Sequence, residues 1–311
     1  MVTFPIIDAH VHLWNPARFH MPWLEEVPAI MRPYELDQYL AQTAGLPIEG
    51  IIYIEVDVPP EDALREAQWI VDCAQHDARI QGIVAAAAIE ERERLRPYLE
   101  SLVALDPRIK GVRRNLQGET APGFCLQPAF VEGVQMLPEY DLSFDLCLTH
   151  TQMPDVIQLV RLCPETRFIL DHLGKPDIRD HMLDPWRDHI RELASCPNVM
   201  CKLSGMVTEA DHQQWVPEDL APYIAHVLDT FGEDRVLFGS DWPVMLLATS
   251  YPRWVQVLDD LTAHLTPAAK RKLWSENARR WYRLRFQSDV LFIASGCIAD
   301  VLSAIISVVH C

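Results

Sequence analysis

Two histidines, His10 and His12, stand two residues apart, shortly after the apolar pair Ile6 and Ile7. Side chains at positions i and i+2 of a strand lie on the same face, so both imidazoles are expected to point to one side. Imidazole is the commonest protein ligand for transition metals and the commonest general base. The spacing alone can arise by accident, so a functional interpretation needs further residues that converge on this pair.

Two later segments supply such residues, because His172 follows one apolar segment and Asp241 follows another. Taken singly, His172 could be a buried structural histidine and Asp241 could cap the next helix, since aspartate is a favoured N-cap. Taken together with His10 and His12, they make three imidazoles and one carboxylate. Such a group could hold one metal ion such as zinc, or bind a water molecule directly. We therefore predict that these four residues form a functional site, either around one metal ion or around a bound water molecule.

The elements that would position this site alternate between strands and helices. We predict eight buried strands at Pro5–His10, Gly50–Glu55, Gly82–Ala87, Ile109–Arg113, Leu142–Leu148, Arg167–Asp171, Val199–Leu203 and Arg235–Gly239. We predict helices between them at Glu61–Gln75, Glu90–Leu105, Gln127–Glu139, Pro154–Cys163, Asp184–Ser195, Pro217–Phe231 and Tyr251–Leu261. The alternation predicts a single (β/α)₈ TIM barrel, whose active site lies at the C-terminal ends of the strands. An open doubly wound sheet is the alternative, but no Gly-x-Gly-x-x-Gly follows the first strand.

Composition narrows the class of protein. The net charge of −17, from 44 acidic residues against 27 Lys and Arg, disfavours binding to nucleic acid and to anionic membranes. Eight scattered cysteines include no CxxC pair, and the residues before the first expected strand do not resemble a signal peptide. We therefore expect reduced thiols and a cytoplasmic protein. Whether the protein forms a homo-oligomer stays open.

The end of the chain differs from the rest. Residues 1–284 are assigned to the barrel, and residues 285–311 to a C-terminal extension that is nearly all apolar from Phe292 to Cys311. This stretch is about long enough to cross a bilayer, but Asp300 near its middle would cost about 2.5–3.5 kcal/mol. We expect an extension packed on the barrel or on a partner subunit, with a disordered tail and a membrane anchor as alternatives.

Five motifs resemble the amidohydrolase superfamily, and more narrowly its branch of sugar lactonases. That branch includes L-fuconolactonase-like and L-rhamnonolactonase-like enzymes and relatives that act on pyrone dicarboxylate and muconolactone-type substrates. The resemblance runs from about residue 5 to residue 284. The motifs are Asp8-Ala-His10-Val-His12-Leu-Trp14, Gly111-Val-Arg113, Leu170-Asp-His172-Leu-Gly-Lys-Pro176, Lys202-Leu-Ser-Gly205 and Phe238-Gly-Ser-Asp241-Trp-Pro243.

The resemblance implies hydrolysis of a cyclic ester at His10, His12, His172 and Asp241, with Asp241 as the base that takes a proton from water. It implies at most one divalent ion, zinc before others, and hydrolysis without metal is the alternative. A second ion is not expected, because the strand Val199–Leu203 offers a lysine where a further histidine would be needed.

Further residues are candidates for binding substrate. By resemblance, Arg113 is assigned to the carbonyl or to an acidic group of the substrate, with a salt bridge on the rim as its alternative. Glu55 stands where the family leads us to expect glutamine, and it could bind sugar hydroxyls or pair with Arg113. His150 is a candidate substrate contact or an ordinary loop histidine. Indoles that could stack on a sugar or pyrone ring, with simple packing as the alternative, are Trp14, Trp23 and Trp242.

The hypothesis from sequence is a lactonase that opens a sugar-derived lactone or a related dicarboxylate lactone with water. Two alternatives remain. One is a metal-dependent decarboxylase or amidase of the same superfamily. The other is a barrel that binds sugar or metal without turnover.

Overall fold

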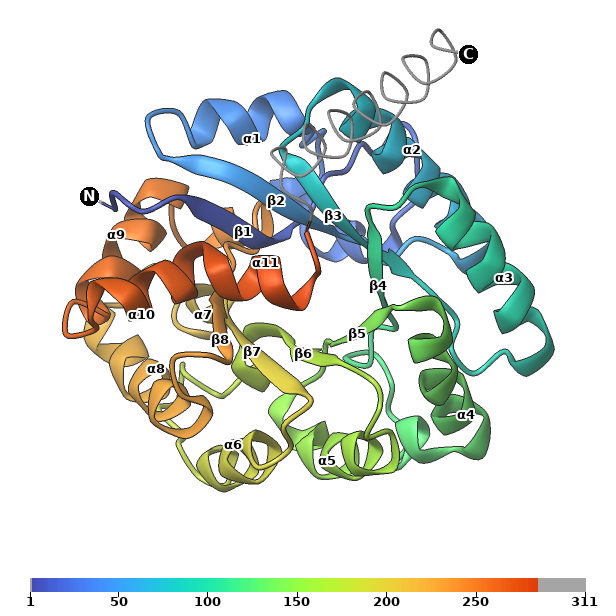
Figure 1. The fold of residues 1–311 in the computed structure, drawn as a ribbon. Coiled ribbons are helices and arrows are strands. Elements are labelled where there is room, and N and C mark those ends of the chain that lie inside the picture. The colour runs from blue at the N-terminus through green and yellow to red at the C-terminus, as the bar shows by residue number, and fades with distance from the viewer. Residues whose placement is uncertain (1, 285–311) are drawn as a thin grey trace, which may run out of the picture.

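Eight parallel strands form a barrel in which each strand pairs with the next one along the chain (Figure 1). The computed structural model describes residues 2–284. Two backbone hydrogen bonds join the end of β1 to the segment after β8, from His12 N to Trp242 O (2.7 Å) and from Asp241 N to His10 O (2.9 Å). The predicted TIM barrel is therefore confirmed. Its strands are β1 Ile6–Val11, β2 Ile48–Ile54, β3 Ile80–Ala86, β4 Ile109–Arg113, β5 Ser143–Leu146, β6 Phe168–Leu170, β7 Val199–Leu203 and β8 Val236–Phe238.

Helices surround the ring of strands on its outside (Figure 1). Those expected from the sequence are α2 Ala63–His76, α3 Arg92–Leu105, α4 Pro128–Met136, α5 Met153–Leu162, α6 Trp186–Ala194, α8 Pro217–Phe231 and α9 Tyr251–Leu261. Helices that the sequence analysis missed are α1 Leu36–Gln42, α7 Met206–Glu209, α10 Pro267–Arg271 and α11 Asn277–Trp281. The missed helices have only four to seven residues, and a helical period cannot be recognised over so short a stretch.

The interior of the barrel has an apolar layer beneath a charged one. Apolar side chains that point inward from the strands include Ile7, Ile52, Val84, Ile169, Met200 and Leu237, and Ala278 and Tyr282 from the region of α11 join them. Two positions after Ile169 and Met200, on the same face of each strand, come the fully buried Asp171 and Lys202. Barrel interiors are usually filled with branched apolar residues, so this charged layer needs a reason.

The remaining sequence predictions about the chain as a whole are only partly tested. The C-terminal extension at residues 285–311 lies outside the described residues. Within residues 2–284 no helix has both the length and the apolar composition needed to span a bilayer. The six cysteines in this part of the chain form no disulfide. The cytoplasmic location and the oligomeric state stay predictions.

Glu66 of α2 is a buried carboxyl group that fixes the end of β2. Its Oε1 accepts hydrogen bonds from the Tyr53 hydroxyl (2.6 Å) and from the backbone N–H of Val56 (2.8 Å). Burial, aided by the nearby charge of Glu55, raises the pKa of Glu66 to about 8. The folded protein therefore keeps a proton that the unfolded chain loses above its ordinary pKa of 4.5, so stability falls as pH rises towards 8.

We expect Glu66→Gln to remove this loss of stability, because glutamine keeps the accepting oxygen and does not ionise. In wild type, ionisation of Glu66 should lower the free energy of unfolding by up to about 1.4 kcal/mol per pH unit, and this contribution should be absent in Glu66→Gln. The measurement is urea unfolding at several pH values between about pH 5 and pH 8. The matched control is Glu61→Gln, which changes an exposed carboxylate near the start of the same helix and should keep the wild-type slope. Equal slopes in wild type and Glu66→Gln would contradict this account.

Candidate active site

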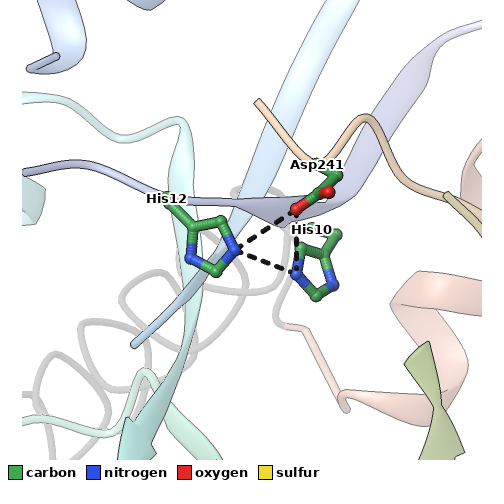
Figure 2. A group of neighbouring side chains, drawn as sticks. All are labelled: His10, His12 and Asp241. Carbon is green, nitrogen blue, oxygen red and sulfur yellow. Dashed lines mark hydrogen bonds and ion pairs between the residues drawn. The ribbon is translucent and has the colours of Figure 1, made fainter. Parts of the chain in front are cut away.

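His10, His12, His172 and Asp241 converge at the C-terminal end of the barrel, as the sequence predicted. The Nε2 atoms of His10 and His12 lie 3.1 Å apart. Asp241 Oδ1 lies 3.6 Å from Nε2 of His10 and 3.4 Å from Nε2 of His12 (Figure 2). Nε2 of His172 lies 3.9 Å from the same oxygen. Three ring nitrogens therefore face one carboxylate oxygen.

The backbone that carries two of these residues is in the left-handed region. The φ angle is 64° at Asp241 and 53° at His172. A residue with a Cβ pays about 1–3 kcal/mol in such conformations, which cluster at functional sites. The Asp241 carboxylate makes no capping hydrogen bond to the short helix Val244–Leu247, so the alternative of a helix cap is not what the structure shows.

Hydrogen bonds at Nδ1 fix the orientation of two of the imidazoles. Nδ1 of His12 lies 2.9 Å from the carbonyl oxygen of Ile54. A carbonyl only accepts, so Nδ1 of His12 carries a hydrogen, and this bond turns Nε2 of His12 towards Asp241. Nδ1 of His172 lies 2.9 Å from the Ser204 hydroxyl. Partners of this kind are typical behind metal-binding histidines.

The charge state of the cluster follows from its burial. Burial lowers the pKa of His172 to about 4 and the pKa of His10 well below its usual range, despite the nearby carboxylates. Burial opposes ionisation of Asp241, yet the surrounding imidazoles, with His172 foremost, hold the pKa of Asp241 below its ordinary value. At neutral pH the site therefore combines neutral imidazoles at His10 and His172 with an ionised carboxylate.

The donor atoms present fit a zinc ion. One nitrogen each from His10 and His12 and a carboxylate oxygen of Asp241 lie within 4.8 Å of one another. Tetrahedral zinc with bonds of about 2.0–2.1 Å spaces its ligand atoms about 3.3 Å apart. The measured separations of 3.1, 3.4 and 3.6 Å bracket that value. His10, His12 and Asp241 would hold the ion, with His172 beside them.

Lys202 and two aspartates form a buried charged group directly behind His10. The Lys202 ammonium lies 2.6 Å from Asp145 Oδ2 and 2.8 Å from Asp171 Oδ1, and all three side chains are fully buried. His10, Asp171 and His172 also bring donor atoms within 4.8 Å of one another. A second ion there would compete with the ammonium that already neutralises Asp171. From sequence, Lys202 and Asp171 were placed within family motifs but were given no role in the site, and Asp145 was not recognised.

Asp8 is a second residue whose role the sequence analysis missed, although it begins the first motif. Its Oδ1 accepts hydrogen bonds from the backbone N–H of Ser240 (2.8 Å) and of His10 (3.2 Å). Its Oδ2 accepts from the hydroxyls of Tyr39 (3.1 Å) and Tyr251 (2.9 Å). Asp8 therefore ties β1 to the segment that carries Asp241. Its position two residues before His10, on the same face of the strand, was the available signal.

Arg113 lies inside the site, and Glu55 pairs with it. The Arg113 guanidinium contacts Glu55 Oε1 through Nε (2.5 Å), the carbonyl oxygen of Glu55 (2.8 Å) and Asp171 Oδ2 (3.4 Å). Of the two alternatives for Glu55, pairing with Arg113 is the one that the structure shows. The pair is buried, so it is not a salt bridge on the rim. Arg114 points the other way and binds Glu90 (2.9 Å), as the pleat of the strand predicts.

The sequence profile of the amidohydrolase family matches residues 7–284. The chain belongs to the amidohydrolase family. An L-fucono-1,5-lactonase of Burkholderia multivorans is 33% identical over 301 residues, which cover 91% of this chain and 97% of that protein. An L-rhamnono-gamma-lactonase of Scheffersomyces stipitis is 23% identical and covers 91% of this chain and 100% of its own length.

A solved structure agrees with this assignment. An amidohydrolase of Burkholderia multivorans, crystallised with bound zinc, superposes with a TM-score of 0.82 and is 31% identical. The match covers 90% of this chain and 99% of that one. The resemblance to the sugar-lactonase branch is therefore confirmed, and this amidohydrolase is an enzyme of that group.

A cavity of about 280 Å³ opens above the cluster of this amidohydrolase. Trp23 and Val27, from the long loop after β1, form part of its wall, so this loop covers part of the mouth of the barrel. Three indoles were candidates for stacking on a ring, and Trp23 alone among them lines the cavity. The polar side chains of the wall are those of His12, Asp57, Arg113, Asn115, Gln117, His172, Lys175 and Asp241.

Three residues predicted to contact substrate have other surroundings. Trp14 and Trp242 are fully buried and have no exposed face for a ring to stack on, so their predicted stacking role is corrected to packing. Both indoles pack edge-on against Tyr34. His150 does not line the cavity, and its Nδ1 lies 3.1 Å from the carbonyl oxygen of Lys175. The structure thus favours the loop alternative for His150.

A larger cavity of about 450 Å³ adjoins the first one. The two share Asp57, Arg113 and Asn115 as a common wall. The larger cavity is lined by no histidine, whereas the smaller one contains His12, His172 and Asp241. Three of the four predicted site residues therefore line the smaller cavity.

Proposed function

We propose that this amidohydrolase hydrolyses a lactone, either a sugar-derived aldonolactone or a related dicarboxylate lactone, to the open hydroxy acid. The observation that carries the proposal is an ionised carboxylate, Asp241, that faces converging imidazole nitrogens at the base of a cavity large enough for a small ring. The lactonases among its relatives support the same reaction class.

Asp241 is the residue we assign as general base. A water molecule within reach of its carboxylate loses a proton to Asp241 as its oxygen attacks the lactone carbonyl carbon. The tetrahedral intermediate then expels the ring oxygen, and Asp241 returns the proton to that oxygen. Asp241 therefore serves first as the proton acceptor and then as the proton donor in cleavage of the ester C–O bond.

The negative charge on the carbonyl oxygen needs stabilising groups. A zinc ion bound by His10, His12 and Asp241 would supply a Lewis acid at this point. Arg113 offers a second positive charge on the wall of the cavity, and we assign it to the carbonyl or to a carboxylate of the substrate. A well-placed donor to such an oxyanion contributes about 3–4 kcal/mol. In the metal-free alternative the protein's own donors alone carry this task.

We expect the purified enzyme to open at least one member of a panel of aldonolactones and muconolactone-type lactones faster than the spontaneous reaction. Each opened ring releases an acid, so a pH indicator follows the rate. Carbon dioxide or ammonia release from other substrates, without lactone opening, would favour the decarboxylase or amidase alternative. Binding of a lactone without turnover would favour a non-catalytic barrel. Either result would contradict the proposed function.

A further inference from the structure

Nδ1 of His10 lies between a donor and an acceptor that require opposite tautomers of its ring. The Lys202 ammonium and the Oδ1 atom of Asp171 are each 3.3 Å from this nitrogen. An ammonium group only donates hydrogen bonds, whereas a carboxylate only accepts them. Contact with Lys202 therefore places the ring hydrogen on Nε2 of His10, and contact with Asp171 places it on Nδ1.

The hydrogen bonds of the structure form a complete chain for the first tautomer. Lys202 donates to Nδ1 of His10, and Nε2–H of His10 then donates to Nε2 of His12 at 3.1 Å. In its neutral form His12 can accept there, because its single ring hydrogen is then on Nδ1 and is donated to Ile54. Oδ1 of Asp171 makes no aligned hydrogen bond with His10, and its charge partner is the Lys202 ammonium at 2.8 Å.

The two tautomers differ in what they offer to a cation. With the hydrogen on Nε2, His10 has no lone pair directed into the site. Of the three residues that would hold zinc, only His12 and Asp241 can then act as ligands. With the hydrogen on Nδ1 and donated to Asp171, Nε2 of His10 directs a lone pair to the point that His12 and Asp241 face. A carboxylate behind a ligating histidine is the usual way to fix this second tautomer.

We propose that Lys202 and Asp171 together set the tautomer of His10, and through it the affinity of the site for a divalent cation. The inference rests on the metal site of the proposed function. Binding of the ion moves one hydrogen of His10 from Nε2 to Nδ1, and the number of protons on the ring stays the same. Lys202 is thus a positioning residue that opposes binding of the ion, and Asp171 is one that favours it.

The ammonium of Lys202 is held where it is by contacts on its other side. Asp145 Oδ2 lies 2.6 Å from it and also accepts a hydrogen bond from the Tyr282 hydroxyl (2.8 Å). Lys202, Asp145 and Asp171 are fully buried, so no bulk water competes for these contacts. Lys202 and Asp171, the two candidate partners of His10 Nδ1, are therefore both held in place by buried contacts.

A variant that removes one charge of each sign reduces the contribution of simple electrostatics. Lys202→Met alone would also strengthen cation binding by removing a positive charge. The double variant Lys202→Met/Asp145→Asn removes one positive and one negative charge, and Asp145 makes no contact with His10. The net charge of the group is then unchanged, but the removed ammonium lies nearer to His10 than the removed carboxylate, so the tautomer measured by NMR is the deciding observation. The tautomer proposal predicts tighter binding, by about 10-fold or more, as is typical of partners behind metal ligands.

The tautomer itself is measured by ¹⁵N NMR of the metal-free protein labelled at histidine, with His10→Asn identifying the signal of His10. We expect Nε2 of His10 to carry the hydrogen in wild type and Nδ1 to carry it in the double variant. Wild-type protein with the hydrogen on Nδ1 would overturn the proposal, and this wild-type result needs no variant to fold.

Zinc affinity is measured by competition with a chromophoric chelator. Tighter binding by the double variant supports the proposal, and equal or weaker binding overturns it. A wild-type protein that binds no zinc, together with NMR signals as expected, would remove the metal from the proposed function and leave the assignment of the tautomer standing. The two failures are therefore distinguishable.

Discussion

Asp241→Asn lowers kcat for lactone hydrolysis by about 10²- to 10⁴-fold, which is the usual contribution of a positioned general base. Asparagine has nearly the same size and keeps one oxygen near the imidazoles, but it cannot take a proton from water. The loss should therefore appear in kcat more than in KM. The measurement is the initial rate on the best lactone of the panel, followed by a pH indicator.

A matched control excludes a general effect of replacing aspartate by asparagine. Asp234 lies just before β8, at the opposite end of the strand, where it is exposed and pairs with Lys272. Asp234→Asn should keep the wild-type kcat. If Asp241→Asn keeps most of the wild-type rate while Asp234→Asn behaves in the same way, Asp241 is not the base.

Lys202→Met lowers the free energy of unfolding by about 3–5 kcal/mol, because it leaves Asp145 and Asp171 buried without their cation. Methionine fills a similar volume, so the loss reports the missing charge rather than a cavity. The measurement is urea unfolding at neutral pH. Adding Asp145→Asn should recover a large part of the loss, since only Asp171 then remains, with Arg113 still 3.4 Å away.

The control for this prediction is a lysine of the surface. Lys272 pairs with Glu233 and Asp234, both of them exposed. Lys272→Met should cost no more than about 1 kcal/mol, which is typical of solvent-exposed ion pairs. Losses of equal size at Lys202 and Lys272 would show that burial of the charged group does not matter in the way described here.

The barrel could be predicted because the sequence pattern that indicates it is repeated along the chain. Eight short apolar segments alternate with helical periods, and an error at one boundary leaves the pattern intact. The strands Ile109–Arg113 and Val199–Leu203 were placed at their observed bounds. The convergence of His10, His12, His172 and Asp241 followed from the fold, because strand C-termini meet at one end of a parallel barrel.

The contacts of single side chains could not be predicted in the same way. The spacing of Trp14 and Trp242 does not say whether an indole lies against a ligand or against other aromatic rings, and the structure shows the second. For Glu55, the sequence allowed binding to sugar hydroxyls or pairing with Arg113, and only the position of Arg113 in the structure decides between them. The burial of Lys202, in contrast, could have been predicted. Lys202 stands two positions after Met200 on the same strand, so its side chain must point into the barrel, where a charge needs buried partners.

The central claim is that a lactone is opened at position 241, within the cavity of about 280 Å³. The most direct measurement is a crystal structure of Asp241→Asn with the best lactone of the panel. We predict an intact ring in this cavity, with its carbonyl carbon next to position 241 and its carbonyl oxygen directed at His10, His12 or Arg113. A lactone bound instead in the adjoining cavity of about 450 Å³, with its carbonyl remote from position 241, would contradict the account.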